Sequence, residues 1–151
     1  MVTVARLPGY LDMDLQYGPP PLAKTTLAMP RGGTYCISAT MLQQLGFDGP
    51  PGPWNREHEN SYQKDRQRID QILQMFRDSP SEAAKQVRGD PQYWEGLSKE
   101  YLYLRFGRLC EYLRQRKPDD SAGHSILIYR LSDDQVRQAL LGDPAELCSA
   151  K

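Results

Sequence analysis

The sequence lacks any long apolar run and any excess of one charge. No segment of the 151 residues reaches the roughly 18 apolar residues that a membrane-spanning helix needs. Lys and Arg together number 19, and Asp and Glu also number 19, so no overall basic field attracts nucleic acid. From these residues we expect no membrane span and no nucleic-acid partner.

Cysteine is also scarce. Cys36, Cys110 and Cys148 lie far apart and form no Cys-x-x-Cys pair. This spacing argues against a zinc site and against a disulfide framework, and it predicts buried structural thiols. An odd number of unpaired cysteines favours a reducing compartment. The start, MVTVAR, does not have the basic stretch followed by an apolar one that marks a signal peptide. Taken alone, these features favour a cytoplasmic location.

The length fits a single soluble domain, residues 1–151, that needs no metal or disulfide to fold. Short β-favouring runs predict strands around 2–7, 34–38 and 125–131. Apolar residues at spacings of three and four predict helices around 62–78, 91–116 and 132–141, the last opened by a capping box at Ser132 and Gln135. The predicted class is α/β, with a small sheet of about three strands packed against helices.

Two further expectations concern the sheet. The run SILIYRL at 125–131 is apolar on both faces except for Arg130, which predicts a strand covered on both sides. A right-handed crossover would make the second and third strands parallel neighbours, if they pair directly.

Two acidic patterns resemble metal sites. Asp12 and Asp14 form a D-x-D, which can bind a divalent cation that carries the phosphates of a sugar nucleotide. No strand clearly precedes it, so a chance spacing is favoured. Glu57, His58 and Glu59 are adjacent and point to different sides of a helix, so they cannot chelate one ion together. We predict no metal site and no cofactor.

His124 precedes the last predicted strand, and strand ends in α/β sheets often hold functional residues. The sequence shows no nucleophile partner for it, and Ser38 and Ser125 lack a G-x-S-x-G elbow. A turn histidine is favoured over a catalytic base. A small hydrolase or transferase that uses His124 with Ser38 or Asp12 is a second alternative, which requires these side chains to lie within hydrogen-bond reach in a pocket.

Residues 99–117 are locally basic, with six Lys or Arg residues against two Glu residues, a net charge of +4. A basic helix face can contact anionic lipid headgroups or phosphate. The usual alternative is a solvated face beside a buried one. Arg105, Arg108 and Arg114 are the candidates for this basic face.

Two stretches, GGTYCISATMLQ at 32–43 and GHSILIYR at 123–130, resemble the soluble C-terminal region of bacterial membrane glycosyltransferases that use polyprenyl-phosphate sugars, related to protein mannosyltransferases and aminoarabinose transferases. In that family a G-x-Y-x-I-S-A-T-x-L-Q stretch precedes a G-x-S-I-x-[VI]-Y strand near the chain end. The matching residues are Tyr35, Ile37, Ser38, Ala39, Thr40, Leu42 and Gln43 in the first stretch, and Gly123, Ser125, Ile126, Ile128 and Tyr129 in the second.

The resemblance implies a small α/β unit on the extracytoplasmic face of the membrane. The family's catalytic acid lies in a loop near the first transmembrane helix, which has no counterpart here, so no catalytic residue carries over. The implied function is a non-catalytic accessory domain that contributes to binding of acceptor or lipid-linked sugar, with the glycosyltransferase core or lipid headgroups as partners. The ligand-binding candidates are Tyr35, Ser38, Thr40 and His124. The alternative is a free-standing cytosolic protein-interaction module.

Overall fold

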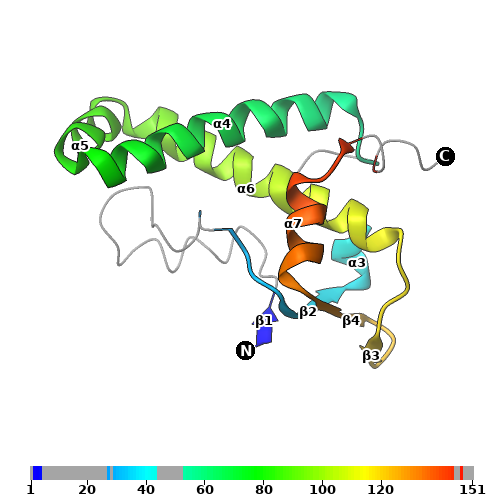
Figure 1. The fold of residues 1–151 in the computed structure, drawn as a ribbon. Coiled ribbons are helices and arrows are strands. Elements are labelled where there is room, and N and C mark those ends of the chain that lie inside the picture. The colour runs from blue at the N-terminus through cyan, green and yellow to red at the C-terminus, as the bar shows by residue number, and fades with distance from the viewer. Residues whose placement is uncertain (1, 5–26, 28, 44–52, 145–146, 148–151) are drawn as a thin grey trace.

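The computed structural model describes residues 2–4, 27, 29–43, 53–144 and 147. These residues form an α/β unit in which the helices lie on one side of a four-stranded sheet (Figure 1). The predicted fold class is therefore confirmed. Within the described part of the chain, no helix is both long enough and apolar enough to cross a membrane.

The sheet has the strand order β1-β2-β4-β3. Its strands are β1 (Val2–Val4), β2 (Gly33–Ser38), β3 (Asp120–Ala122) and β4 (Ile126–Leu131). β1 runs parallel to β2, whereas β2 and β4 are antiparallel, with Tyr35 opposite Tyr129. The two main predicted strands thus pair directly, but the expectation that they are parallel is wrong.

The antiparallel pairing of β2 and β4 results from β3. The sequence does not predict this strand, because its residues DSA show no β-favouring pattern. β3 pairs antiparallel with β4 and forms a hairpin with it, so the chain reverses immediately before β4. The turn contains Gly123 at a φ of 62°, a conformation that glycine adopts without strain. Because this hairpin reverses the chain, the crossover rule for parallel strands does not apply to β2 and β4.

Five helices lie in the described part of the chain: α3 (Ala39–Leu42), α4 (Arg56–Asp78), α5 (Pro80–Gly89), α6 (Pro91–Arg114) and α7 (Asp133–Leu141). The three predicted helices correspond to α4, α6 and α7. α4 begins at Arg56, earlier than predicted, because the Asn55 side chain accepts a hydrogen bond from the backbone N–H of His58. This first turn is polar, so apolar spacing does not reveal it.

The buried residues form two clusters. A helical cluster lies among α4, α5 and α6 and includes Trp54, Tyr62, Ile69, Trp94 and Tyr101. A sheet cluster lies between the sheet and α3, α6 and α7 and includes Tyr35, Ile37, Leu113, Tyr129 and Leu140. Ile126 and Ile128 face the other side of the sheet and are only half-buried, so the described residues do not confirm that β4 is covered on both sides.

Gly32, in the first stretch of the resemblance, explains how β2 meets α7. Its backbone N–H donates to Asp133 Oδ1 at 2.7 Å, in the first turn of α7. A Cβ atom at position 32 would lie 2.6 Å from the backbone nitrogen of Asp133. Glycine is therefore required for this close approach.

The cysteines fit the structural interpretation in part. Cys110 is fully buried, and burial raises the pKa of its thiol to about 12. Cys36 is a half-buried free thiol on β2, and Cys148 lies outside the described residues. The prediction of a buried thiol is thus confirmed for Cys110.

Candidate functional site

Arg108 of α6 has no solvent exposure and contacts two other helices. Its Nε atom donates to Glu59 Oε2 of α4 at 2.9 Å. Its two terminal nitrogens donate to the carbonyl oxygens of Ala139, at 2.5 Å, and Gly142, at 2.8 Å, where α7 ends. Arg108 therefore joins α4, α6 and the C-terminal end of α7 through one guanidinium group.

The end of α7 depends on this contact. α7 has no basic residue in its last turn, although positive charge is favoured at a helix C-terminus. Arg108 supplies that charge from α6. The hydroxyl of Tyr62 adds a hydrogen bond to the Leu140 carbonyl at 3.1 Å, and the Tyr62 ring lies 5.6 Å from the Arg108 guanidinium.

Glu59 is the negative partner and is also buried. Burial acts to raise the pKa of its carboxyl, but hydrogen bonds from Arg108, Gln63 and Trp54 outweigh burial and leave that pKa below its ordinary value. The Trp54 Nε1 atom lies 2.8 Å from Glu59 Oε2, and the Gln63 Nε2 atom lies 2.5 Å from Glu59 Oε1. Glu59 is therefore ionised in a buried and hydrogen-bonded pair.

The other two basic-face candidates also contact backbone carbonyls. Arg114 donates to the Leu42 carbonyl at the end of α3, at 3.3 Å, and to Glu111 Oε2 at 2.5 Å. Arg105 donates to the Leu27 carbonyl at 3.3 Å, and its guanidinium lies 5.4 Å from the centre of the Tyr101 ring. Both arginines are half-buried.

The prediction that Arg108 lies on an exposed basic face is therefore wrong. Arg105 and Arg114 are only partly exposed, and each already donates to a backbone carbonyl. α6 packs against α3, α4, α5 and α7, so it is buried around much of its circumference. The planar guanidinium group has several donors, and these meet carbonyl groups of neighbouring segments rather than solvent. Charge spacing alone gives no signal for this, because the same pattern also fits an exposed face.

The strand ends singled out by the sequence lie together in the structure. Ser38 ends β2 opposite Ile126, and the backbone N–H of Ala39 donates to the Ser125 carbonyl at 2.7 Å. Thr40, in α3, and His124, in the β3–β4 turn, are exposed at this end of the sheet. The structure thus brings the C-terminal end of β2 and the N-terminal end of β4 together at one end of the sheet. Residues 38–40 and 123–125 at this end are here called the strand-end edge.

Two of the ligand-binding candidates have structural contacts. The Ser38 Oγ atom accepts a hydrogen bond from the backbone N–H of Met41 at 3.1 Å and caps α3. Tyr35 is buried in the sheet cluster, and its hydroxyl donates to the Arg31 carbonyl at 2.6 Å. Burial raises the pKa of the Tyr35 hydroxyl. Of the four candidates, Thr40 and His124 are the ones whose side chains face solvent.

The catalytic alternative gains no geometric support. In the described part of the chain, no hydrogen bond joins His124 to Ser38, and the Ser38 hydroxyl already caps a helix. Asp12 and Asp14 lie outside the described residues. Among the residues that are described, no three His, Cys, Asp or Glu side chains gather in an arrangement that could hold a metal ion.

Comparison of the chain with protein-family models, curated proteins and solved structures finds no match.

Proposed function

We propose that this chain is a non-catalytic accessory domain of a membrane glycosyltransferase, acting at the extracytoplasmic face. The pairing of β2 with β4 carries the proposal. The two stretches that resemble this family are far apart in the sequence, yet β2 and β4 pair in register from Gly33–Leu131 to Ser38–Ile126. The resemblance therefore falls on one contiguous piece of structure, as expected for a shared structural unit and not for two unrelated coincidences.

Within this unit, the side chains divide into structural and exposed ones. Tyr35, Ile37 and Tyr129 are buried in the sheet cluster, and Ser38 caps α3. Thr40 and His124 remain exposed at the strand-end edge. This edge is the part of the unit that we propose contacts the glycosyltransferase core or its sugar-bearing ligand.

The open reading frame that encodes this chain provides the first test. An accessory domain of this kind follows a series of apolar membrane segments, so we expect such segments to be encoded upstream of Val2 in the same frame. A reading frame that begins at Met1 and encodes this chain alone contradicts the proposal. Sequencing the genomic region is sufficient to decide.

A transfer assay with the full-length membrane protein tests the proposed role of the strand-end edge. We expect Thr40→Ala with His124→Ala to raise KM for the acceptor or donor several-fold and to leave kcat unchanged, because an accessory contact stabilises ground state and transition state equally. Ser81→Ala with Gln92→Ala, two exposed sites far from this edge, is the matched control. A loss of kcat at constant KM contradicts a non-catalytic role.

A second candidate is a protein-interaction module, favoured by the outer face of the sheet. Cys36, Ile126 and Ile128 lie on that face and are half-buried. An apolar segment of a partner protein would cover these side chains. A free-standing reading frame, together with protection of the β4 amides from hydrogen exchange when that partner binds, would favour this candidate over the accessory domain.

A further inference from the structure

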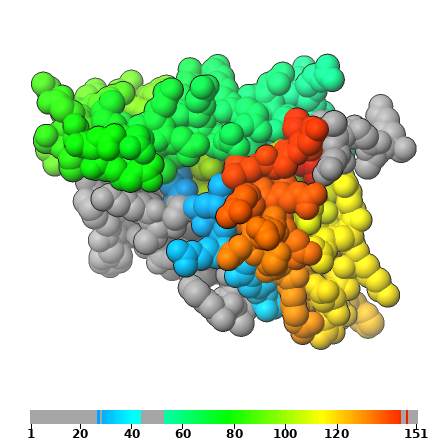
Figure 2. All heavy atoms as spheres, viewed as in Figure 1, coloured from blue at the N-terminus to red at the C-terminus, as the bar shows by residue number. Residues whose placement is uncertain are grey.

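A cleft lies between the end of α6 and the end of α7. Its volume of about 460 Å³ falls within the range of roughly 300–1,000 Å³ that is typical of small-molecule sites. Figure 2 shows the two elements side by side on one face of the molecule, with α7 in orange and the end of α6 in yellow. The chemistry of the lining decides which ligand such a cleft can take.

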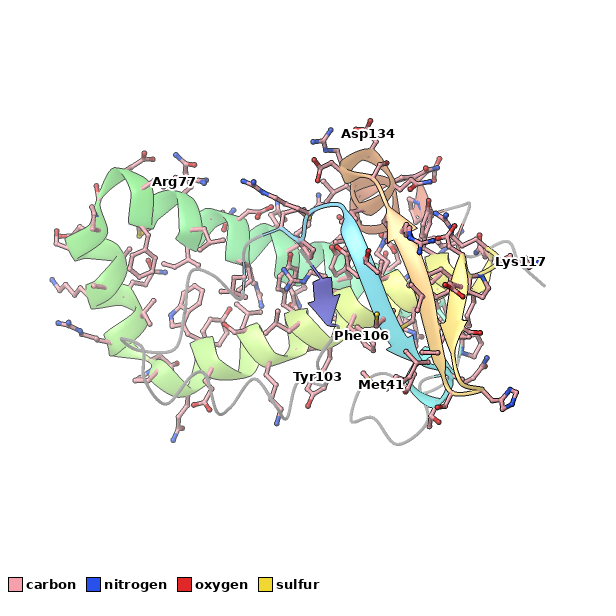
Figure 3. All side chains as sticks on the ribbon, turned by 90° about the horizontal axis from the view of Figure 1, so that it is seen from below. Met41, Arg77, Tyr103, Phe106, Lys117 and Asp134 are labelled. Atoms are coloured by element: carbon pink, nitrogen blue, oxygen red, sulfur yellow. The ribbon has the colours of Figure 1, made fainter. Side chains whose placement is uncertain are left out.

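The unpaired polar groups of this lining are hydrogen-bond donors. Among the described residues, no ion pair or hydrogen bond engages the side chains of Tyr112, Arg116 and Lys117, all of which line the cleft. Lys117 is exposed just beyond the end of α6 (Figure 3), whereas Arg116 is half-buried. Burying a cation is costly unless an acceptor or an anion pairs with it. The cleft thus presents three free donors, two of them cationic.

The other polar residues of the lining are already engaged. Gln115, Gln138 and Asp143 each have interactions of their own. Asp143 contributes the one negative charge of the lining, against the two positive charges of Arg116 and Lys117. The groups left for a ligand therefore suit one that accepts hydrogen bonds and carries a single negative charge.

The two cations are not needed to neutralise the helix ends at the cleft, although helix C-termini do attract positive charge. At the end of α6, the carbonyls of residues 112 and 113 accept the backbone N–H groups of residues 115 and 116. At the end of α7, the carbonyls of residues 138, 139 and 140 accept hydrogen bonds from Gly142, Arg108 and Tyr62. Arg116 and Lys117 are therefore available to an external anion.

The rest of the lining is apolar. The half-buried Tyr112 packs against both the helical and the sheet cluster, and Leu147 is buried in the helical cluster. Both border the cleft, so an apolar ligand body could pack against them beside the two cations. Tyrosine suits such a position because its ring is apolar and its hydroxyl polar.

We propose that this cleft binds a small carboxylate with an apolar, aromatic body. The planar Arg116 guanidinium matches the two oxygens of a carboxylate and donates to both, and the Lys117 ammonium adds a second charge-assisted contact. The Tyr112 ring and the Leu147 side chain contact the apolar body. The proposal concerns a surface other than the strand-end edge, and it does not depend on the accessory role.

Titration of the ¹⁵N-labelled 151-residue chain with 3-phenylpropionate at neutral pH tests the proposal. Acetate, which has the carboxylate without the aromatic body, and 3-phenylpropanamide, which has the body without the charge, are titrated in parallel. Inorganic phosphate is the competing anion. We expect saturable shifts of the amide signals of Arg116, Lys117 and Gln138, and tighter binding of 3-phenylpropionate than of the other three compounds.

The double variant Arg116→Gln/Lys117→Gln removes both cations. We expect it to bind 3-phenylpropionate at least roughly tenfold more weakly, as for the loss of charge-assisted contacts to a carboxylate. The matched control is Lys85→Gln/Arg88→Gln, which removes the same charge from exposed positions on α5, at the far end of the molecule (Figure 1). We expect this control to bind like the unchanged protein.

Four results would overturn the proposal. The first is the absence of saturable binding, and the second is equal weakening in the two double variants. The third is equal affinity for 3-phenylpropionate and 3-phenylpropanamide, which would leave the carboxylate without a role. The fourth is acetate or inorganic phosphate binding as tightly as 3-phenylpropionate, which would reduce the cleft to a general anion site.

Discussion

The helical cluster and the sheet cluster are built from different kinds of side chain. All the buried polar residues in the described part of the chain lie on α4 or α6: Glu59, Asp65, Ser98, Arg108 and Glu111. The sheet cluster is mostly aliphatic, apart from Tyr35 and Tyr129, and contains no buried charge of its own among the described residues. The helical layer therefore contains buried polar groups, of which Glu59, Arg108 and Glu111 are hydrogen-bonded, whereas the sheet layer depends on apolar area.

This difference separates two sources of stability. Apolar burial is non-directional and tolerates small shifts, whereas a buried ion pair is stable only when both partners and their hydrogen bonds are present. Removing one charged partner from the helical layer should therefore lower the free energy of unfolding more than removing several methyl groups from the sheet layer.

The largest effect is expected for Arg108→Met. This change leaves Glu59 buried without its cation and removes the hydrogen-bond donors to the carbonyls of Ala139 and Gly142. Breaking a buried pair in this way costs about 3–5 kcal/mol. Urea denaturation followed by circular dichroism measures the change in the free energy of unfolding.

A companion variant separates the lost charge from the lost volume. Glu59→Gln combined with Arg108→Met removes both charges, so we expect the double variant to regain part of the stability lost in the single variant. A cost below about 1 kcal/mol for Arg108→Met would be typical of an exposed ion pair, and it would contradict the buried contact.

In the sheet layer, Ile37→Ala should cost about 3 kcal/mol, through lost apolar contact and the cavity that remains. Ile37 has no solvent exposure and packs in the sheet cluster. Ile128→Ala is the matched control on the half-buried outer face, and it should cost clearly less in the same urea experiment. Equal costs would show that the outer face is as tightly packed as the inner one, and would erase the contrast between the faces.

A smaller effect is expected at the start of α7, where the capping box lies. The Ser132 Oγ atom accepts from the Gln135 backbone N–H at 3.2 Å, and Gln135 Oε1 accepts from the Ser132 backbone N–H at 2.9 Å. Ser132→Ala should lower the free energy of unfolding by about 1 kcal/mol. In thermal unfolding, Ser81→Ala on exposed α5 should change the midpoint much less, and equal shifts would argue against a capping role.

Features set by neighbouring residues were predictable from the sequence. The capping box at Ser132 and Gln135, the β-favouring runs of β2 and β4, and the apolar spacing on α4 all depend on residues close in the chain. The sequence also named Ser38 and His124 as ligand-binding candidates, and the strand ends that carry them lie at one end of the sheet.

Features set by distant segments were not predictable. The burial of Arg108 requires three helices to converge, and no local pattern distinguishes an arginine that meets carbonyl groups from one that meets water. The antiparallel pairing of β2 and β4 depends on β3, whose residues are exposed and show no β-favouring pattern. A cleft lined in part by Arg116 and Gln138 likewise depends on where the distant helices α6 and α7 end.

The smallest expected effect arises from a polar group in the helical layer that lacks a partner. Tyr62 of α4 stacks on Tyr101 of α6, with ring centres 5.8 Å apart. The two helices run antiparallel (Figure 1), so Asp65 and Ser98, each one turn from this stack, lie at the same level of the interface. Asp65 Oδ2 and Ser98 Oγ are both buried and have no hydrogen-bond partner among the described residues. Asp65 is therefore the opposite of Glu59, whose carboxylate is fully paired.

Asp65→Asn should stabilise the protein at neutral pH. Burial raises the pKa of Asp65 above its ordinary value of 3.8, and the Glu100 carboxylate raises it further, against the opposing charges of Arg68 and Lys64. The folded state therefore holds this proton more tightly than the unfolded state, so the native protein loses stability as pH rises from about 3.8 through the raised pKa. The gain in Asp65→Asn should be largest above that range and should vanish below it, as measured by thermal unfolding against pH. Asp70→Asn, which removes an exposed carboxylate from the same helix, is the matched control. A stability gain in Asp65→Asn that persists at low pH would assign the effect to packing and not to the buried charge.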